Sequence, residues 1–159
     1  MLFYQRAAAR IACEEKMSEI NKSVLVGYSA QQMFALVDDV ESYPEFLPWC
    51  GGAGYRDERR TRATIEINFR GIRQSFTTEN TKDAPHVMQM KLVEGPFRTL
   101  DGGWRFTELS GQGCKIEFRL HYEFSSRLLE KLVGPVFSHI ANTIVDGFIH
   151  RAEKVYDRA

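Results

Sequence analysis

The feature that most constrains the fold is an alternation of apolar and polar residues, which continues with short interruptions over residues 55–124. In its last run, Ile116, Phe118 and Leu120 alternate with charged residues such as Glu117. Successive side chains of a strand point to opposite faces of a sheet, so this period of two predicts half-buried strands. Short turns can join only antiparallel neighbours. The sequence therefore predicts an antiparallel sheet with one apolar face.

Turn signals separate the alternating runs from one another. They lie at Gly71 and at residues 82–85, 94–96, 101–103 and 110–113, and each of them contains Gly or Pro. Gly and Pro are the residues that most often interrupt a regular element, so we expect the chain to turn at each of these points.

A further alternating run and a short helical segment precede this stretch. Val24 and Val26 alternate with polar or small residues over residues 20–28, which brings the expected sheet to about seven strands. Apolar residues recur at helical spacing over residues 30–40, and Ser29 with Gln32 has the form of a capping box. Beyond this helix, Pro44 can start a short helical turn, and the Gly51-Gly52 pair predicts a turn or a bulge.

The last segment, residues 127–156, carries an apolar stripe at helical spacing that could cover the apolar face of the sheet. A helix of this length spans roughly 45 Å, which is enough to cross a whole sheet. Pro135 follows Gly134 inside the segment, and proline removes a hydrogen bond from a helix. We therefore expect a kink there, or a short helix followed by a longer one.

Composition favours one soluble domain without a metal centre or a strong overall charge. The chain has 159 residues, 21 basic and 21 acidic side chains and three widely spaced cysteines. A net charge near zero provides no general attraction for DNA, and the cysteines fit neither a disulfide framework nor a zinc site. No apolar run approaches the length of a membrane span. We expect a reducing cytoplasm as the compartment.

The N-terminal residues 1–16 lie outside the strand pattern, which begins just after Met17. We interpret them as an extension upstream of a natural start at Met17. A short N-terminal helix packed on a neighbour is the alternative. The single domain is expected to comprise residues 18–157.

The inward-facing positions of the sheet suggest a pocket for a flexible hydrophobic ligand. Met88 and Met90 share one strand and Trp104 and Phe106 another, and methionine adapts well to irregular apolar ligands. A packed core explains the same residues. Four polar residues share the inward parity and are candidate anchors for a carbonyl or hydroxyl group, unless they pair with the backbone or lie in water: Gln74, Thr78, Asn80 and Tyr122.

Two other groups of residues invite a functional interpretation. Arg59, Arg60 and Arg62 form a basic stretch that could contact RNA phosphates, although a solvated hairpin face without a function is the favoured explanation. His139 and His150 share a helix face but lie about three turns apart, too far to bind one metal directly. Motifs of hydrolases, nucleotide-binding loops and zinc proteases do not occur.

Three stretches of the sequence resemble a known family: VLVGYSAQQMFALVDDVESYPEFLPWC, LVEGPFRTLDGGWRF, and the ending from CKIEFRLHYEFSSRLL through GPVF to RAEKVY. They are similar to the coenzyme Q-binding and ribosome association toxin family, within the START-like group of lipid-transfer and polyketide cyclase proteins. The resemblance covers residues 18–156. It implies an α+β helix-grip fold, similar to START and Bet v 1 proteins, with a hydrophobic cavity between sheet and C-terminal helix.

The resemblance leads to three functional expectations. The first is a protein that is not an enzyme and binds ubiquinone or a related polyprenyl quinone or lipid, supports respiration, touches a membrane transiently and lies near the inner membrane. The second is a toxin that binds the large ribosomal subunit through the three arginines and blocks subunit joining. The third and weakest is a polyketide cyclase or dehydratase, because strand parity places no His, Asp or Glu inward.

These expectations define the candidate site. No cofactor is required, and the ligand would be the bound quinone or lipid. Phe46, Leu47 and Trp49 would form the mouth of the cavity. The cavity itself would be lined by Gln74, Phe76, Thr78, Met88, Met90, Trp104, Phe106, Tyr122, Phe137 and Ile140.

Overall fold

The computed structural model describes residues 17–157, so the expectations for residues 1–16 lie outside the described part. The strands are β1 (Met17–Val26), β2 (Cys50–Tyr55), β3 (Arg62–Phe69), β4 (Ile72–Asp83), β5 (Val87–Glu94), β6 (Phe97–Glu108) and β7 (Cys114–Phe124). The helices are α2 (Ala30–Asp38), the 3-10 turn η1 (Val40–Ser42), α3 (Tyr43–Phe46) and α4 (Arg127–Tyr156).

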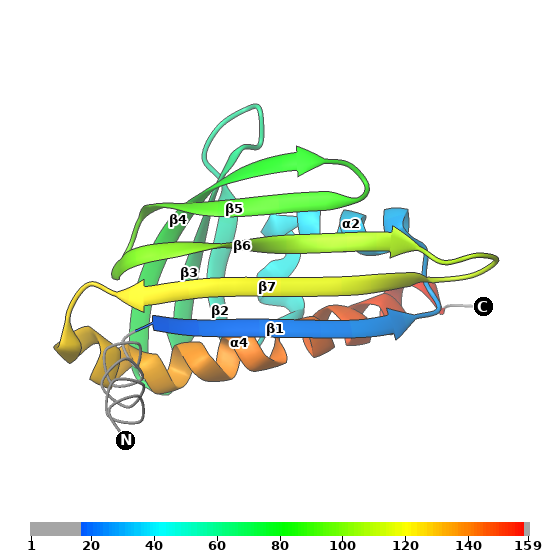
Figure 1. Cartoon of the computed structure of the whole chain (residues 1–159). Coiled ribbons are helices and arrows are strands. Elements are labelled where there is room, and N and C mark those ends of the chain that lie inside the picture. The colour runs from blue at the N-terminus through cyan, green and yellow to red at the C-terminus, as the bar shows by residue number, and fades with distance from the viewer. Residues whose placement is uncertain (1–16, 158–159) are drawn as a thin grey trace, which may run out of the picture.

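The seven strands form one antiparallel sheet in the order β1-β7-β6-β5-β4-β3-β2. Strands β2 to β7 follow one another as in the sequence, and β1 pairs with the last strand, β7. The sheet bends around α4, which lies against its inner face (Figure 1). The predicted α+β helix-grip architecture is therefore confirmed.

The segment between β1 and β2 follows the local sequence signals. The Ser29 side chain accepts a hydrogen bond from the Gln32 backbone N–H at 3.1 Å, and the Gln32 side chain accepts one from the Ser29 N–H at 2.9 Å. This reciprocal capping box fixes the start of α2. Pro44 lies in the first turn of α3, and the register of β2 shifts between Cys50 and Gly52, as expected for a bulge.

The expected break at residues 101–103 is wrong, because β6 runs through it without interruption. Gly102 and Gly103 sit in the middle of the strand, paired on both sides. A Cβ atom on Gly102 would lie 2.1 Å from the carbonyl oxygen of Arg119, and one on Gly103 would lie 2.4 Å from that of Met88. The glycines therefore allow a close approach of neighbouring backbones rather than a turn.

The alternative of two C-terminal helices is also wrong, since α4 is continuous over its 30 residues with Pro135 inside it. The carbonyl of the exposed Lys131 loses its helical partner there and can bind water instead. By length and composition α4 could also span a membrane, which corrects the expectation that no stretch is long and apolar enough. In this fold α4 packs on the sheet through one face, on which Val136, Phe137 and Ile140 are buried.

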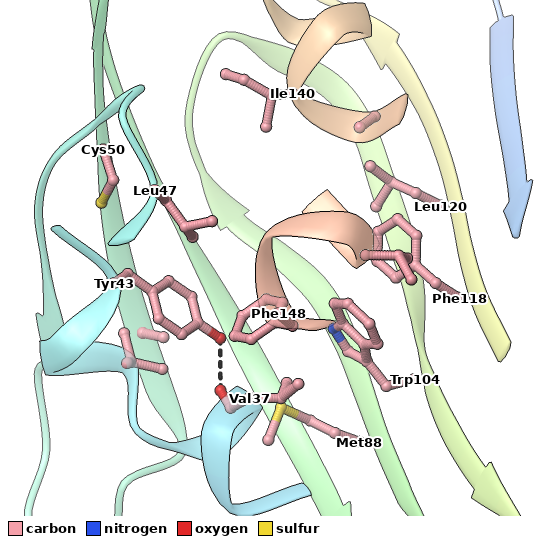
Figure 2. Packing of buried hydrophobic residues seen from close by; sticks show 14 of the residues in the cluster. Val37, Tyr43, Leu47, Cys50, Met88, Trp104, Phe118, Leu120, Ile140 and Phe148 are labelled. Carbon is pink, nitrogen blue, oxygen red and sulfur yellow. Dashed lines mark hydrogen bonds between the residues drawn. The ribbon is translucent and has the colours of Figure 1, made fainter. Parts of the chain in front are cut away.

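Two groups of aromatic rings fill most of the space between the sheet and α4. In the first, Trp104 packs against Phe118 and Phe148, with ring centroids 4.5 and 5.3 Å apart (Figure 2). In the second, Phe137 packs against Phe97 and Tyr122 at 4.9 and 4.7 Å. Any internal ligand site must lie between or beside these two groups.

Candidate ligand-binding site

A small apolar cavity lies where the two aromatic groups meet, between the sheet and α4. Its volume is about 60 Å³. Cavities that bind small molecules usually measure about 300–1,000 Å³, and an apolar cavity that admits benzene measures about 150 Å³. The interior is therefore nearly filled in this state. The lining residues are Tyr43, Trp49, Ile65, Phe76, Thr78, Met90, Leu100, Trp104, Phe118, Leu120, Phe137, Ile140, Ala141 and Ile144.

The lining is apolar except for a few hydrogen-bonding groups that already have partners. The hydroxyl of Thr78 donates to the side-chain oxygen of Asn80 at 2.7 Å, and both residues are buried. The Tyr43 hydroxyl donates to the backbone oxygen of Val37 at 2.5 Å (Figure 2). Burial raises the pKa of Tyr43 well above its ordinary value, so the phenol stays neutral. Neither residue offers an acid or base with a pKa near neutrality.

The structure brings together six of the ten side chains expected to line the cavity: Phe76, Thr78, Met90, Trp104, Phe137 and Ile140. Met88 and Phe106 are buried in the surrounding core, and Gln74 is half-buried outside the lining. Tyr122 instead borders a separate open pocket of about 280 Å³ between the end of β7 and α4.

Several lining residues were missed although the sequence pattern contained a signal for them. Phe118 and Leu120 have the inward parity of β7, and Ile144 follows Ile140 by four residues on α4. Tyr43 and Leu100 had no such signal. Leu100 lies just before the glycines that were interpreted as a break in the strand.

The three expected mouth residues line an open groove of about 570 Å³ between the 44–49 segment and α4. Trp49 borders both spaces, and Leu47 and Trp49 are almost fully buried. Gly147 of α4 lets this segment approach, because a Cβ atom there would lie 2.7 Å from Leu47 Cδ2. Phe46 packs under Arg151, whose guanidinium lies 5.0 Å from the ring centroid.

The three arginines expected to contact RNA do not form one uniform patch. Arg60 is bound into the fold, with a salt bridge of 2.8 Å to Glu41 and its guanidinium 4.2 Å from the ring centroid of Tyr55. The hydrogen bond from Arg60 lowers the pKa of Glu41. Arg59 and Arg62 are exposed. Only these two are available for a partner without disturbing a contact within the fold.

The chemistry of the cavity is that of an apolar binding site. Its lining contains no carboxylate, imidazole, amine or thiol. Within residues 17–157, no cluster of His, Cys, Asp and Glu side chains could hold a metal ion. Every buried side-chain nitrogen or oxygen in that range has a hydrogen-bond partner.

A bent antiparallel sheet that encloses an apolar space against one long helix defines a helix-grip protein of the START type. Residues 26–149 match the family described as polyketide cyclase / dehydrase and lipid transport. The chain is 42% identical over 142 residues to the ribosome association toxin RatA of Vibrio cholerae, covering 88% of this chain and 99% of the relative. The ribosome association toxin RatA of Escherichia coli is 43% identical to this chain over 142 residues, covering 88% of this chain and 90% of the relative. This chain belongs to the polyketide cyclase / dehydrase and lipid transport family.

A more distant relative carries a different name. The mitochondrial coenzyme Q-binding protein homolog B of Xenopus laevis is 30% identical over 149 residues, covering 90% of this chain and 61% of the relative. Among solved structures, a START superfamily protein of Mycobacterium smegmatis has a TM-score of 0.69 at 21% identity, covering 86% of this chain and 98% of that one. An aromatase/cyclase of a Streptomyces species has a TM-score of 0.70 at 16% identity, covering 87% and 94%. These two structures support the fold.

Proposed function

We propose that this protein is a non-enzymatic binding protein for a hydrophobic ligand, and that the ligand is a polyprenyl quinone such as ubiquinone, or a related lipid. The observation that carries the proposal is the apolar cavity between the sheet and α4, with Thr78 as a hydrogen-bonding group in its wall. Apolar burial at about 25 cal/mol per Å² would supply most of the binding free energy. The name of the Xenopus relative supports a quinone as the ligand.

A volume of about 60 Å³ cannot hold a quinone ring, so binding requires the interior to expand. Met90 can change its rotamer readily, because its side chain is unbranched. Trp49 and Leu47 form the wall toward the open groove, so a displacement of this segment would join the groove to the cavity. The proposal therefore describes the observed conformation as a closed one that opens when the ligand enters.

The two tryptophans of the chain, Trp49 and Trp104, provide a direct test because both border the cavity. A quinone that enters the cavity should quench both, as measured by titrating a short-chain ubiquinone analogue into Trp49→Phe and Trp104→Phe, each of which retains one tryptophan. Mass spectrometry of an organic extract of the purified protein identifies any ligand carried from the cell. An empty extract together with unquenched fluorescence would contradict the proposal.

The matched variants for this test are Ala141→Leu and Ala35→Leu. Ala141 borders the cavity, so three added carbons fill much of its volume, and the titration should show little or no quenching. Ala35 is an exposed residue of α2, and leucine there should leave quenching as in the wild type. Circular dichroism checks that both variants are folded.

The lining also supports a role without catalysis. A cyclase or dehydratase needs a general acid or base within hydrogen-bond reach of its substrate. The cavity offers only the hydroxyls of Thr78 and Tyr43 and the indole groups, and both hydroxyls donate within the fold.

Association with the large ribosomal subunit is a second candidate function, favoured by one observation. The ribosome association toxins of Vibrio cholerae and Escherichia coli are 42 and 43% identical to this chain over 142 residues, whereas the coenzyme Q-binding relative of Xenopus laevis is 30% identical. The filled interior does not oppose it, because binding to RNA uses the outside of the molecule. Cosedimentation with purified large subunits tests this candidate independently of the quinone titration.

A further inference from the structure

The outer face of the sheet carries an open groove of about 520 Å³ over strands β1, β7, β6 and β5. These strands lie side by side on the side of the sheet opposite α4 (Figure 1). The register places Asn21, Arg119, Gly103 and Gln89 in one row across them. Gly103 has no side chain, so the surface is hollow between its longer neighbours.

The groove has an excess of basic side chains although the chain as a whole is neutral. Its only acidic lining residue is Glu117, which lies 3.2 Å from Lys115. Arg119 is 61% exposed, and its one ion pair, with Asp101, is long at 3.9 Å. The basic residues that line the groove are Lys22, Arg105, Lys115 and Arg119.

Arg105 is a groove cation without a partner in the described part of the fold. It is exposed on β6, two residues from the glycine floor, and makes no ion pair or hydrogen bond with the described residues. Arginine presents a planar set of donors that matches two phosphate oxygens, and it is weakly hydrated compared with lysine. Arg119 on β7 is directly opposite Gly103, and Arg105 is two residues further along β6, so both arginines border the hollow at Gly103.

We infer that this outer-face groove is an RNA-binding surface, in which Arg105 and Arg119 contact the phosphodiester backbone of an unpaired RNA strand. The inference deepens the ribosome-association candidate and rests on it. The carboxamides of Asn21 and Gln89 flank the same strip and can bond to base edges or 2′-hydroxyls. None of the strongly exposed apolar residues lines the groove: Leu128 and Leu132 lie on α4, and Leu25 lies beside the groove on β1, paired with Lys115.

The test uses the full chain, a short fluorescein-labelled single-stranded RNA and purified bacterial large ribosomal subunits. The variant Arg105→Glu/Arg119→Glu should weaken RNA binding at least roughly tenfold, and each lost phosphate contact should reduce the slope of log K against log salt by about 0.7. The same variant should no longer cosediment with large subunits. The milder Arg105→Gln/Arg119→Gln variant should also lose RNA and subunit binding, but to a smaller extent. It provides the same test if the charge-reversed variant does not fold.

The matched control is Arg59→Glu/Arg62→Glu, which reverses two exposed charges beside the opposite edge of the sheet. The inference predicts that this control binds RNA and large subunits like the wild type. Loss of binding in the control alone would overturn the inference while leaving the ribosome candidate intact. If neither the wild type nor any variant cosediments with large subunits, the ribosome-association candidate fails. Binding of the RNA oligonucleotide by the wild type, weakened in the Arg105/Arg119 variants, would then still support the groove as an RNA-binding surface, and no such binding would overturn it.

The last experiment measures binding to vesicles of phosphatidylglycerol and phosphatidylcholine. They carry phosphate without an RNA strand. Equal loss of vesicle and RNA binding in the Arg105/Arg119 variants would indicate a general anionic surface and overturn the assignment to RNA. Binding of RNA without binding of vesicles supports it.

Discussion

At the scale of single residues, Asp57 sets the conformation of the turn between β2 and β3. Its carboxylate accepts hydrogen bonds from the backbone N–H groups of Thr61 and Arg62 at 2.9 Å each, and from the Thr61 hydroxyl. The Thr61 side chain and then the Arg62 N–H lower the pKa of Asp57 to about 2. The turn holds Arg60, at a positive φ of 59°, against Glu41.

This arrangement predicts a pH dependence of stability. A carboxylate whose pKa is lowered by folding stabilises the native state above its unfolded pKa of about 3.9, and this contribution disappears as the pH falls toward 2. Asp57→Ala should therefore lower the melting temperature at pH 7, and its difference from the wild type should shrink between about pH 4 and pH 2. Glu58→Ala, an exposed change in the same turn, should have little effect at either pH. A constant difference across this range would contradict the role of the charge.

Strand parity identified much of the candidate site from single residues, because Phe76, Thr78, Met90 and Trp104 all face inward as predicted and border the cavity. Parity gives a direction but no volume. The packing of Phe137 and its aromatic neighbours reduces the space to about 60 Å³, and ring packing of this kind cannot be deduced from sequence spacing. Contacts between distant residues are equally invisible in the sequence, so it could not distinguish Arg60, which pairs with Glu41, from the exposed Arg59.

At the scale of elements, the centre of β6 depends on glycine for its contact with β7 and β5. A side chain on Gly102 would place a Cβ atom 2.1 Å from the Arg119 carbonyl oxygen, and a backbone atom in a central strand cannot move aside easily. Gly102→Ala should therefore lower the free energy of unfolding by about 1–3 kcal/mol or more. Urea denaturation measures this change.

Gly54→Ala is the matched control in the edge strand β2. No atom lies within 4 Å of a Cβ built on Gly54, so alanine there should leave stability nearly unchanged. Equal effects of the two variants would show that glycine is not required for the close approach in β6.

The elements themselves were largely predictable, because alternation, helical spacing and caps all act locally. The two errors have a common cause. Gly102-Gly103 in β6 and Gly134-Pro135 in α4 are local interruption signals that tertiary contacts override. In β6 pairing on both sides keeps the strand straight through the glycines, and in α4 the exposed surface near Lys131 lets water replace the hydrogen bond that Pro135 removes.

At the scale of the whole molecule, Trp49 borders both the internal cavity and the open groove beside α4, and Leu47 borders the groove. Leu47 lies so close to α4 that a Cβ atom on Gly147 would be 2.7 Å from Leu47 Cδ2. Quinone binding by the proposed route then requires the 44–49 segment to move away from α4. The rate of ligand entry should consequently depend on the Gly147 contact, although Gly147 is outside the cavity lining.

Gly147→Ala tests this route. The added methyl group would lie 2.7 Å from Leu47 Cδ2, so the Leu47 side chain must shift, and we expect this to weaken the packing of the 44–49 segment on α4. Quinone entry, followed as stopped-flow quenching of tryptophan fluorescence, should become faster than in the wild type. Gly134→Ala is the control, because it makes the same change in the same helix where the closest atom lies at 3.8 Å. Both variants gain roughly 0.5–1 kcal/mol of helix propensity, so only the wall differs between them. Equal rates of entry in the two variants would mean that the ligand does not pass between the 44–49 segment and α4.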